Sequence, residues 1–375
     1  MLVLKDKKGC SGCTACSAVC KHGCISMSSD SEGFLYPDID AARCVDCGLC
    51  ERVCPVAKYR TEPKDAEPEI YAAVNKDKVQ YLNSASGGIY ILLAEYVINK
   101  GGVVCGAAYD ANFNVYHTFA ENMVDCSLFQ SSKYTQSDTR GVYVRIKDYL
   151  KDKQPVLFVG TPCQVTGLRQ YLHKDYEGLF CVDIVCHGVP SPRLYRDYLH
   201  FASNGNRIAK INFKYKTPNV PKTTLRIDFA DGTYIQNCLK TYIWDRLYFG
   251  HYAVRPSCHD CLFTHFNRPG DMTIGDFWGL RKYHPDFHPT DCPSSVLVNN
   301  DKGKMMFESI CSKLDFIESN KSEALQPQLR EPTKSSPYRE AFWKLYESQG
   351  FEAVVKTYGG YTIYNRFKDF IKRYL

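Results

Sequence analysis

The sequence lacks any long apolar run, and this absence bears on where the protein works. No stretch approaches the roughly 18 apolar residues of a membrane span. The best candidate, Ile89 to Ile98, is short and carries Glu95. The start of the chain, MLVLKDKKGC, has no apolar run long enough for a signal peptide. We therefore expect a cytoplasmic protein, soluble or at most peripheral to a membrane, whose 19 cysteines stay reduced.

The sequence also lacks a strong charge bias. A net charge of +6 over 375 residues is modest and spread along the chain, so we predict no nucleic-acid partner. A mild positive balance would steer an acidic electron carrier to the surface. A solvated surface without a particular partner is the alternative. The length suits two or three domains.

Two cysteine runs with the same spacing organise the N-terminal part. CSGCTACSAVC begins at Cys10 and CVDCGLCERVCP begins at Cys44. Both read C-x2-C-x2-C-x3-C, by which two-cluster ferredoxins hold a pair of 4Fe-4S centres, the fourth cysteine of each run serving the other cluster. Gly12 and Gly48 suit the close approach of backbone amides to sulfur. The predicted ligand sets are Cys10, Cys13, Cys16 and Cys54 for one centre, and Cys44, Cys47, Cys50 and Cys20 for the other.

A zinc site or a disulfide knot is the alternative for these runs. A zinc site takes four ligands that come as two pairs. Here each run supplies three closely spaced cysteines and a fourth further on, which gives two sets of four, so the spacing favours iron-sulfur clusters. Cys24 has no place in the pattern and is interpreted as a spare thiol.

The predicted fold class is α/β (α+β), with a small ferredoxin-like domain followed by a larger mixed-sheet domain and a helical C-terminal region. A polar, proline-bearing stretch, YRTEPKDAEPE, follows the cysteine runs and indicates a linker. The predicted parts are a two-cluster domain at 1–60, a linker at 61–69, a larger domain in two portions at 70–150 and 151–300, and the helical region at 301–375.

The larger domain has the alternating strands and helices of α/β units. Strands are expected at 103–109, 113–119, 156–159 and 179–185, with helices opening after the last two. Segments 207–215, 225–229 and 233–237, with a turn at Asp231-Gly232, predict an antiparallel extension that completes the sheet.

A small-residue loop at Ser84 to Gly88 opens a helix that ends at Gly101. Free amides in the first turn of a helix attract anions, so a phosphate of a nucleotide-type cofactor would fit there. The loop has neither the P-loop nor the dinucleotide fingerprint, and a plain helix cap is an equal alternative. The polar loop with Lys133 and Tyr134 does not by itself distinguish a cofactor site from an ordinary surface loop.

Four further cysteines predict a third centre. Cys163 and Cys186 each follow the carboxyl end of an expected strand, where active-site groups of open sheets gather. Cys258 and Cys261 form a C-x2-C pair, which alone would equally suit half a zinc site or a redox dithiol. Two single cysteines and one pair together supply the four thiolates that a 4Fe-4S centre needs, so we predict a third 4Fe-4S centre on these positions.

The last 35 residues form basic amphipathic segments. Such a tail can lie on an anionic membrane or dock a partner. Packing on its own domain is the favoured interpretation. The apolar positions are Phe342, Leu345, Tyr346, Ile363, Phe367, Phe370 and Ile371, interleaved with Lys344, Lys356, Arg366, Lys368, Lys372 and Arg373.

With these segments in view, the chain resembles the beta-subunit family of coenzyme F-420 (deazaflavin) hydrogenases and dehydrogenases, in the form with a fused two-cluster ferredoxin domain. The resemblance runs from Cys10 to about Asn299. Besides the cysteine runs, its stretches are SASGG at 84–88, SSKYTQSD at 131–138, VLFVGTPCQ at 156–164, DIVCHGVPSP at 183–192, RPSCHDC at 255–261 and DMTIGDFWG at 271–279.

The resemblance implies an iron-sulfur flavoprotein whose flavin, usually FAD, sits beside a cluster of its own. Cys163, Cys186, Cys258 and Cys261 fall on the family's cluster cysteines, in agreement with the count above. Residues that fall on the flavin pocket are Ser86, Gly87, Gly88, Lys133, Thr161 and Pro162. Some members exchange hydride with a deazaflavin coenzyme, others take electrons from ferredoxin, and many bacterial members resemble proteins associated with surface-polysaccharide synthesis.

The sequence thus favours an oxidoreductase that passes electrons between a ferredoxin-type carrier and a flavin-bound substrate. His187 is the candidate proton donor, although a histidine beside a ligand cysteine can instead bond a sulfur or the backbone. Asp276 would cap a turn as readily as touch a substrate. One rival is a non-catalytic electron-transfer subunit feeding a partner enzyme. Another is an accessory protein of a glycan pathway that has lost the flavin.

Overall fold

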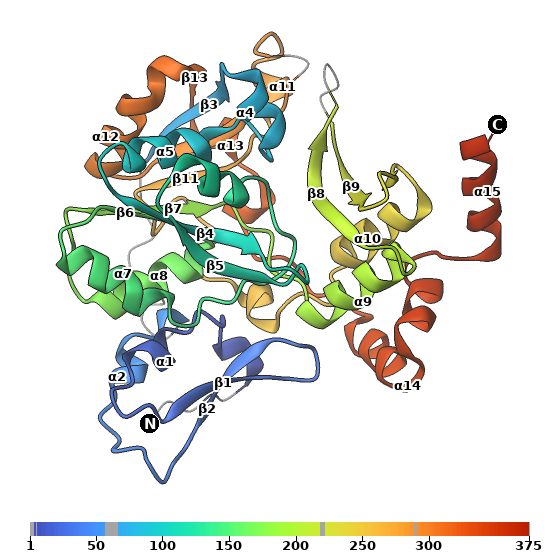
Figure 1. Cartoon of the computed structure of the whole chain (residues 1–375), viewed down its shortest axis with the longest axis horizontal. Coiled ribbons are helices and arrows are strands. Elements are labelled where there is room, and N and C mark those ends of the chain that lie inside the picture. Colours follow the sequence, from blue (N-terminus) through green and yellow to red (C-terminus); the bar gives the residue numbers. More distant parts are fainter. Residues whose placement is uncertain (1–3, 5, 57–66, 218–221, 289–290, 375) are drawn as a thin grey trace.

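The computed structural model describes residues 4, 6–56, 67–217, 222–288 and 291–374. Of the predicted linker, 61–66 lie outside these residues. Figure 1 shows three regions: the N-terminal cysteine domain, a large sheet flanked by helices, and a smaller sheet with the C-terminal helices beside it. The predicted α/β (α+β) class is confirmed.

The N-terminal domain consists of two short helices and a hairpin. The elements are α1 (Ala15–Val19), β1 (Ile25–Ser29), β2 (Leu35–Ile39) and α2 (Leu49–Arg52). The two strands run antiparallel, with Ile25 opposite Ile39. Each helix follows a cysteine loop, and Cys16, Cys50 and the inner side of β1 form one small core.

The large sheet has eight strands within the described residues, in the order β13-β3-β12-β11-β7-β6-β4-β5. Its centre, β4, β6, β7 and β11, is parallel, and antiparallel strands close both edges. The bounds are β3 (Glu69–Asn75), β4 (Val103–Tyr109), β5 (Val115–Ala120), β6 (Val156–Gly160), β7 (Leu179–Ile184), β11 (Met272–Asp276), β12 (Ser294–Val298) and β13 (Leu314–Ser319). The predictions for β4 to β7 are confirmed, whereas β11 to β13 were not predicted.

Helices cover both faces of this sheet (Figure 1). Alternate residues of β6 point to opposite cores: Leu157 packs with α5 (Ile89–Ile98) and α12 (Asp301–Ile310), while Val156 and Phe158 pack with α7 (Val142–Lys151) and α8 (Pro162–Leu172). Burial on both faces explains why the parallel strands read as continuous apolar runs.

The antiparallel segments after α9 (Pro192–Ser203) do not extend the large sheet, and that prediction is wrong. They are β8 (Ile208–Lys216), β9 (Thr223–Phe229) and β10 (Tyr234–Gln236), and they form a separate three-stranded sheet in the order β10-β9-β8. Their apolar side packs with α9 and α10 (Leu239–Phe249) in a second core rich in aromatic rings, including Trp244. Burial of this side against α9 and α10 holds the three strands in a sheet of their own.

The C-terminal region is mostly helical, with β13 as an inserted strand. Helix α14 (Arg339–Thr357) buries Phe342 and Tyr346 in the aromatic core, as expected. For α15 (Ile363–Tyr374) the packing expectation is wrong, because Ile363 and Phe367 are 85% and 64% exposed. Figure 1 shows α15 at the edge of the molecule, where its Asp369 accepts from Leu239 N of α10 at 2.9 Å. The remaining elements are α4 (Lys78–Asn83), α6 (Met123–Cys126), α11 (Leu280–Tyr283), α13 (Lys321–Ala324) and short 3-10 turns, of which η3 (Pro256–Asp260) matters below.

The cysteine domain contacts the rest of the chain at several places, two of which are the following. Cys13 and Ala15 are part of the core that includes α7 and α8. The tip of the β1–β2 hairpin contacts α9 and α14, where Arg339 forms an ion pair with Glu32 and Arg193 Nη1 donates to the Ser31 carbonyl at 2.8 Å.

Candidate functional site

The two cysteine loops of the N-terminal domain share one backbone conformation. Left-handed residues occur two positions after the first cysteine of each run, at Gly12 and Asp46, and one position after the second, at Thr14 and Gly48. Alternating left-handed residues turn successive amides toward the inside of a loop. Gly12 N donates to Cys10 Sγ at 3.4 Å. These loops are therefore shaped to offer amides to sulfur.

Cysteines of the two runs come together in crossed fashion. Burial, and then the neighbouring Cys10 and Cys54 thiolates, raise the pKa of Cys16 to about 12. Burial, and then Cys16, Cys54 and Cys10, raise the pKa of Cys13. Cys54 of the second run thus lies with the first three cysteines of the first run, the arrangement that the crossed ligand assignment requires. A bound cation would favour the ionised form of such buried thiols, in keeping with the predicted iron-sulfur centre.

Cys24, interpreted from the sequence as a spare thiol, lies beside the second ligand set. Its Sγ is 3.3 Å from Cys20 Sγ, and Cys44 is also among the groups that raise its pKa, after Cys20 and burial. The spacing of the cysteine runs gave no signal for it, because Cys24 directly precedes β1 and is not part of either cysteine loop.

The other four predicted ligands converge from three separate segments on one cavity. Cys163 lies in the first turn of α8, Cys186 follows β7, and Cys258 and Cys261 lie in and directly after η3. Burial raises the pKa of Cys186 to about 12, with Cys163 the next cause and Cys261 a smaller one. Burial, then Cys186 and Cys261, raise that of Cys258.

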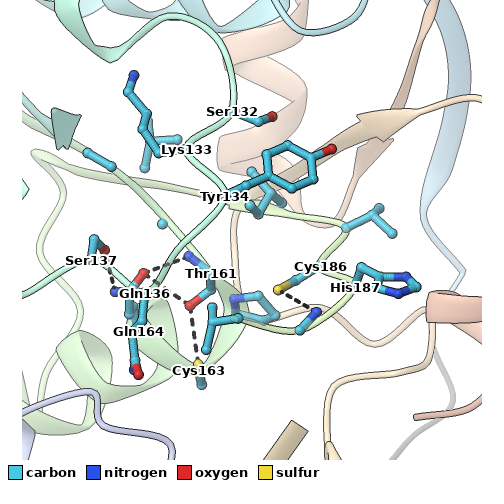
Figure 2. Close-up of a pocket in the computed structure, with 18 of the residues that line it drawn as sticks. Ser132, Lys133, Tyr134, Gln136, Ser137, Thr161, Cys163, Gln164, Cys186 and His187 are labelled. Atoms are coloured by element: carbon cyan, nitrogen blue, oxygen red, sulfur yellow. Dashed lines mark hydrogen bonds between the residues drawn. The ribbon is translucent and has the colours of Figure 1, made fainter. Parts of the chain in front are cut away.

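Local contacts explain how these segments hold their sulfurs. Thr161 and Gln164 cap α8 reciprocally, and Thr161 Oγ1 lies 3.2 Å from Cys163 Sγ. Gly188 N donates to Cys186 Sγ at 3.4 Å (Figure 2). A Cβ at Gly188, whose φ is +113°, would lie 3.2 Å from Cys258 Cβ, so glycine allows the two loops to meet. Within the described residues no group of three or more His, Cys, Asp or Glu side chains is arranged to hold a single metal ion, so the third 4Fe-4S centre on these four thiols stays a prediction.

A buried ion pair stabilises the segments that carry two of these cysteines. Asp183, three residues before Cys186, accepts from Arg268 at 2.6 Å, and both side chains are inaccessible to solvent. Arg268 also donates to the carbonyls of Ile184 and Phe263, which connects the Cys186 loop with the segment after Cys261.

The cavity beside the four cysteines has a volume of about 320 Å³, within the size range of small-molecule sites. The 84–88 loop, the 130–137 loop and the first turn of α8 form much of its wall. Two hydroxyls in this wall, those of Ser11 and Thr135, are buried without a partner in the described part of the chain. Orphaned hydroxyls in a mainly apolar cavity fit a ligand with polar edges, such as a flavin.

The 84–88 loop is held tightly against the sheet. Ser86 Oγ lies 2.7 Å from Ser294 Oγ, which also accepts from Gly87 N at 2.8 Å. A Cβ at Gly87 would lie 2.1 Å from the Ala73 carbonyl oxygen. Gly88 has a φ of +83° and precedes α5, whose first residues also line the cavity. Ser86, Gly88, Thr161 and Pro162 of the predicted flavin pocket all lie in the wall.

The predicted pocket residue Lys133 also lies in the wall, but its amine serves its own loop. Nζ donates to the carbonyls of Leu128, Gln130 and Ser131 at 2.9, 2.8 and 3.3 Å. Burial lowers the pKa of Lys133 to about 7. Figure 2 shows its side chain pointing away from Cys163 and Cys186.

His187 lines the cavity with both ring nitrogens engaged. Nδ1 lies 2.7 Å from Gln328 Nε2, and Nε2 lies 2.9 Å from His251 Nε2. Burial, and then His251, lower the pKa of His187 to about 4. Its ring points away from Lys133 and Thr161 in Figure 2.

Asp276, the last residue of β11, forms an ion pair with Lys214 of β8 at 2.8 Å. Lys216 of the same strand donates to the carbonyls of Tyr81 and Ser86, and its pKa is lowered to about 7 by burial. β8 therefore buttresses the 84–88 loop from the smaller sheet, a role that the sequence did not suggest.

Two known families match the chain. The family described as the C terminus of the coenzyme F420 hydrogenase/dehydrogenase beta subunit matches residues 153–323, and the 4Fe-4S dicluster domain matches residues 9–58. The first match includes all four cysteines of the cavity, and the second includes both cysteine runs.

Known proteins similar to the chain are redox proteins or parts of them. One component of the F(420)H(2) dehydrogenase of Methanosarcina mazei is 23% identical over 331 residues, which covers 83% of this chain and 85% of that protein. The chloroplastic 7-hydroxymethyl chlorophyll a reductase of Oryza sativa subsp. japonica is 27% identical over 187 residues, 48% of this chain but 36% of that protein.

A solved structure has a similar fold. It is a chain of the F420-reducing NiFe hydrogenase complex from Methanosarcina barkeri, with a TM-score of 0.50, 17% identity, and coverage of 79% of this chain and 93% of that one. None of the helices in the described ranges has the length and apolar character needed to span a bilayer.

Proposed function

The chain belongs to the coenzyme F420 hydrogenase/dehydrogenase beta-subunit family, in a form with an added 4Fe-4S dicluster domain, and from this premise we propose that it is an iron-sulfur flavoprotein oxidoreductase. It passes electrons between a ferredoxin-type carrier and a substrate bound at a flavin, most simply FAD. The observation that carries the proposal is that Cys163, Cys186, Cys258 and Cys261 share the wall of one cavity with the 84–88 loop.

The spatial order of the cysteine sets supports this function. Cys47, in the second run, is exposed to solvent. Cys13, in the crossed set, packs on α8, where a Cβ at Gly167 would lie 2.9 Å from its Sγ. Cys163 lies on the same helix about one turn, or roughly 5.4 Å, before Gly167. The chain thus forms a continuous sequence of cysteine sets from the surface to the cavity.

When bound, 4Fe-4S centres exchange single electrons and a flavin exchanges electron pairs as hydride. The residues provide position and access. The 84–88 loop and the α5 N-terminus would hold the anionic part of the cofactor, and Lys133 and Lys216 bind backbone carbonyls of the two cavity loops and so keep their shape.

In this proposal His187, a residue of the cavity wall, is the proton donor; because its pKa is lowered to about 4 it is neutral near pH 7 and would take up a proton through His251 as it gives one to the substrate. Its Nε2 shares a hydrogen bond with His251, which is half-buried and connects the ring to the outside of the site. His187→Gln is expected to slow substrate reduction while flavin and iron content stay unchanged. An unchanged rate assigns His187 to packing.

The substrate is proposed by class. A deazaflavin coenzyme suits the likeness to the F(420)H(2) dehydrogenase component, and another organic acceptor, within surface-polysaccharide synthesis, is the second candidate. An alternative function, that of a non-catalytic electron-transfer subunit, is favoured by one observation: the structural neighbour is a chain of a multi-subunit complex. On that alternative the exposed face of α15, with Ile363 and Phe367, would be a docking surface for the partner enzyme or a membrane.

Anaerobic purification followed by measurement of iron, sulfide and released flavin tests the proposal. About twelve irons with one flavin per chain is expected, because three 4Fe-4S centres would be filled. Reduced ferredoxin should then bleach the flavin absorbance without a partner protein. About eight irons and no flavin would defeat the enzyme proposal and favour the electron-transfer subunit.

A further inference from the structure

Arg255 is a buried arginine between the two domains. It has 0% of its surface exposed and belongs to the RPSC stretch that carries Cys258. Its guanidinium reaches into the N-terminal domain: Nε donates to the Cys10 carbonyl at 2.8 Å, and Nη2 donates to the Leu35 carbonyl at 2.9 Å and to Cys10 Sγ at 3.6 Å. Nη1 donates to Gln136 Oε1 at 2.8 Å.

None of these acceptors is a carboxylate. Removing a guanidinium from water costs several kcal/mol unless an opposite charge lies close by. The neutral carbonyls satisfy its N–H groups, and the Tyr36 ring lies 4.4 Å from its central carbon, but neither supplies a full negative charge. Cys10 Sγ, 3.6 Å from Nη2, is the sulfur that the guanidinium faces, and a centre held by Cys10 would place negative charge there.

The backbone of Arg255 is fixed to the second set of cysteines. Its N–H donates to the Val189 carbonyl at 2.9 Å, and its own carbonyl accepts from Cys258 N at 2.9 Å. One residue is therefore bound by its backbone to the cavity cysteines and by its side chain to Cys10.

Gly12 makes room for this contact. A Cβ at Gly12 would lie 2.8 Å from Arg255 Nη1 and 2.7 Å from Gln136 Nε2. A glycine inside the first cysteine loop thus lets the guanidinium approach the sulfur of the preceding cysteine.

We propose that Arg255 is a positioning residue that sets the reduction potential of the centre held by Cys10, Cys13, Cys16 and Cys54, and that fixes this centre relative to the four cysteines of the cavity. The inference rests on the proposed function for its physiological meaning. A positive charge and an N–H donor beside a cluster sulfur favour the reduced, more negative form, since cluster potentials follow net charge and hydrogen bonds to sulfur. Arg255 therefore raises the potential of the centre nearest to the cavity set and favours electron arrival there.

The test is an EPR-monitored redox titration of the full-length protein carrying Arg255→Gln. The Cys10 centre is identified as the signal that Cys16→Ser alters. Loss of a hydrogen bond from a charged group is expected to change the ratio of reduced to oxidised centre roughly tenfold at fixed potential, equivalent to about 59 mV for one electron, toward lower potential. Arg255→Lys keeps the charge without the planar fork and is expected to shift the potential the same way by less.

Arg339→Gln is the matched control. It also removes an arginine, partly buried, that joins the two domains through Glu32, but it contacts no cysteine in the described residues. Its potential should equal that of the wild type, which separates an electrostatic role from simple domain attachment.

An unchanged potential in Arg255→Gln would overturn the proposal. If that variant loses its iron, Arg255→Lys decides, and a wild-type potential there overturns the proposal equally. Failure of the proposed function is distinguishable, because absence of flavin or of a third centre in the wild type leaves the Cys10 centre available for the same titration.

Discussion

The two groups of cysteines in this molecule are built in opposite ways. The eight of the N-terminal domain come from two short runs whose loops repeat one conformation, with left-handed residues at matching positions. The four at the cavity come from α8, from the end of β7 and from η3, and meet only because the sheet brings those segments together. The first group depends on local sequence and the second on the whole fold, so perturbations of the fold should separate them.

Breaking the buried ion pair of Asp183 and Arg268 should have the largest effect on the free energy of unfolding. Asp183→Asn leaves Arg268 charged and unpaired in a site without solvent, which typically costs about 3–5 kcal/mol. Urea unfolding monitored by tryptophan fluorescence would measure the loss. The control is Asp228→Asn, which removes a partly exposed pair with Arg226 and should cost about 0.5 kcal/mol. Equal effects of the two variants would contradict the account of the cavity's support.

Acid should lower the free energy of unfolding through His117, which lines the cavity. This buried ring lies 3.0 Å from the Val159 carbonyl and 2.9 Å from Ser137 Oγ, and burial lowers its pKa to about 4. In the unfolded chain the pKa is near 6.5, so between pH 6.5 and 4 the unfolded state binds more protons and stability falls as pH falls.

The full effect of this shift is on the order of 3 kcal/mol, at 1.36 kcal/mol per pKa unit. Unfolding free energies at pH 7 and pH 4.5 measure it, and His117→Gln should show a smaller difference between the two. A variant with the same pH dependence as the wild type would show that other groups are responsible.

Replacing Gly87 by alanine should lower the flavin content and leave the iron of the N-terminal domain unchanged. Its Cβ would lie 2.1 Å from the Ala73 carbonyl, so Gly87→Ala must displace the 84–88 loop, at a cost of about 2 kcal/mol. Flavin content should drop while the iron of the N-terminal domain is retained. In Gly178→Ala the new Cβ has an ordinary contact of 3.6 Å, and flavin content should be unchanged. Full flavin content in Gly87→Ala would exclude this loop from the cofactor site.

The smallest effect is expected at Cys20, because Cys24 can replace it. The two sulfurs are 3.3 Å apart. Cys20→Ala should keep most of its iron, whereas Cys20→Ala with Cys24→Ala should lose about four irons. Iron analysis distinguishes these cases, and loss of four irons in the single variant would make Cys24 a bystander.

The sequence allowed the local features to be predicted well. Strand β4 was predicted with its observed bounds, and the loop-helix at 84–98 also forms, because glycines and apolar runs mark both. The grouping of Cys163 and Cys186 was predictable because carboxyl ends of neighbouring parallel strands share one edge.

What the sequence did not allow to be predicted depends on contacts between distant segments. The β8 to β10 strands have the same alternating pattern in a separate sheet as they would at the edge of the large one, so the pattern could not choose between them. Arg255 stood next to a predicted ligand, yet its contact with Cys10 exists only because the two domains pack together. The burial of Phe342 and the exposure of Ile363 likewise follow from tertiary packing, since both lie in similar amphipathic segments.

The iron content of Cys258→Ser with Cys261→Ser tests most directly whether four distant cysteines form a centre of their own. The matched variant, Cys44→Ser with Cys47→Ser, changes the same number of thiols in the N-terminal domain. We predict that the first variant loses about four of about twelve irons while both EPR signals of the N-terminal domain persist. An iron content equal to that of the wild type would contradict the account.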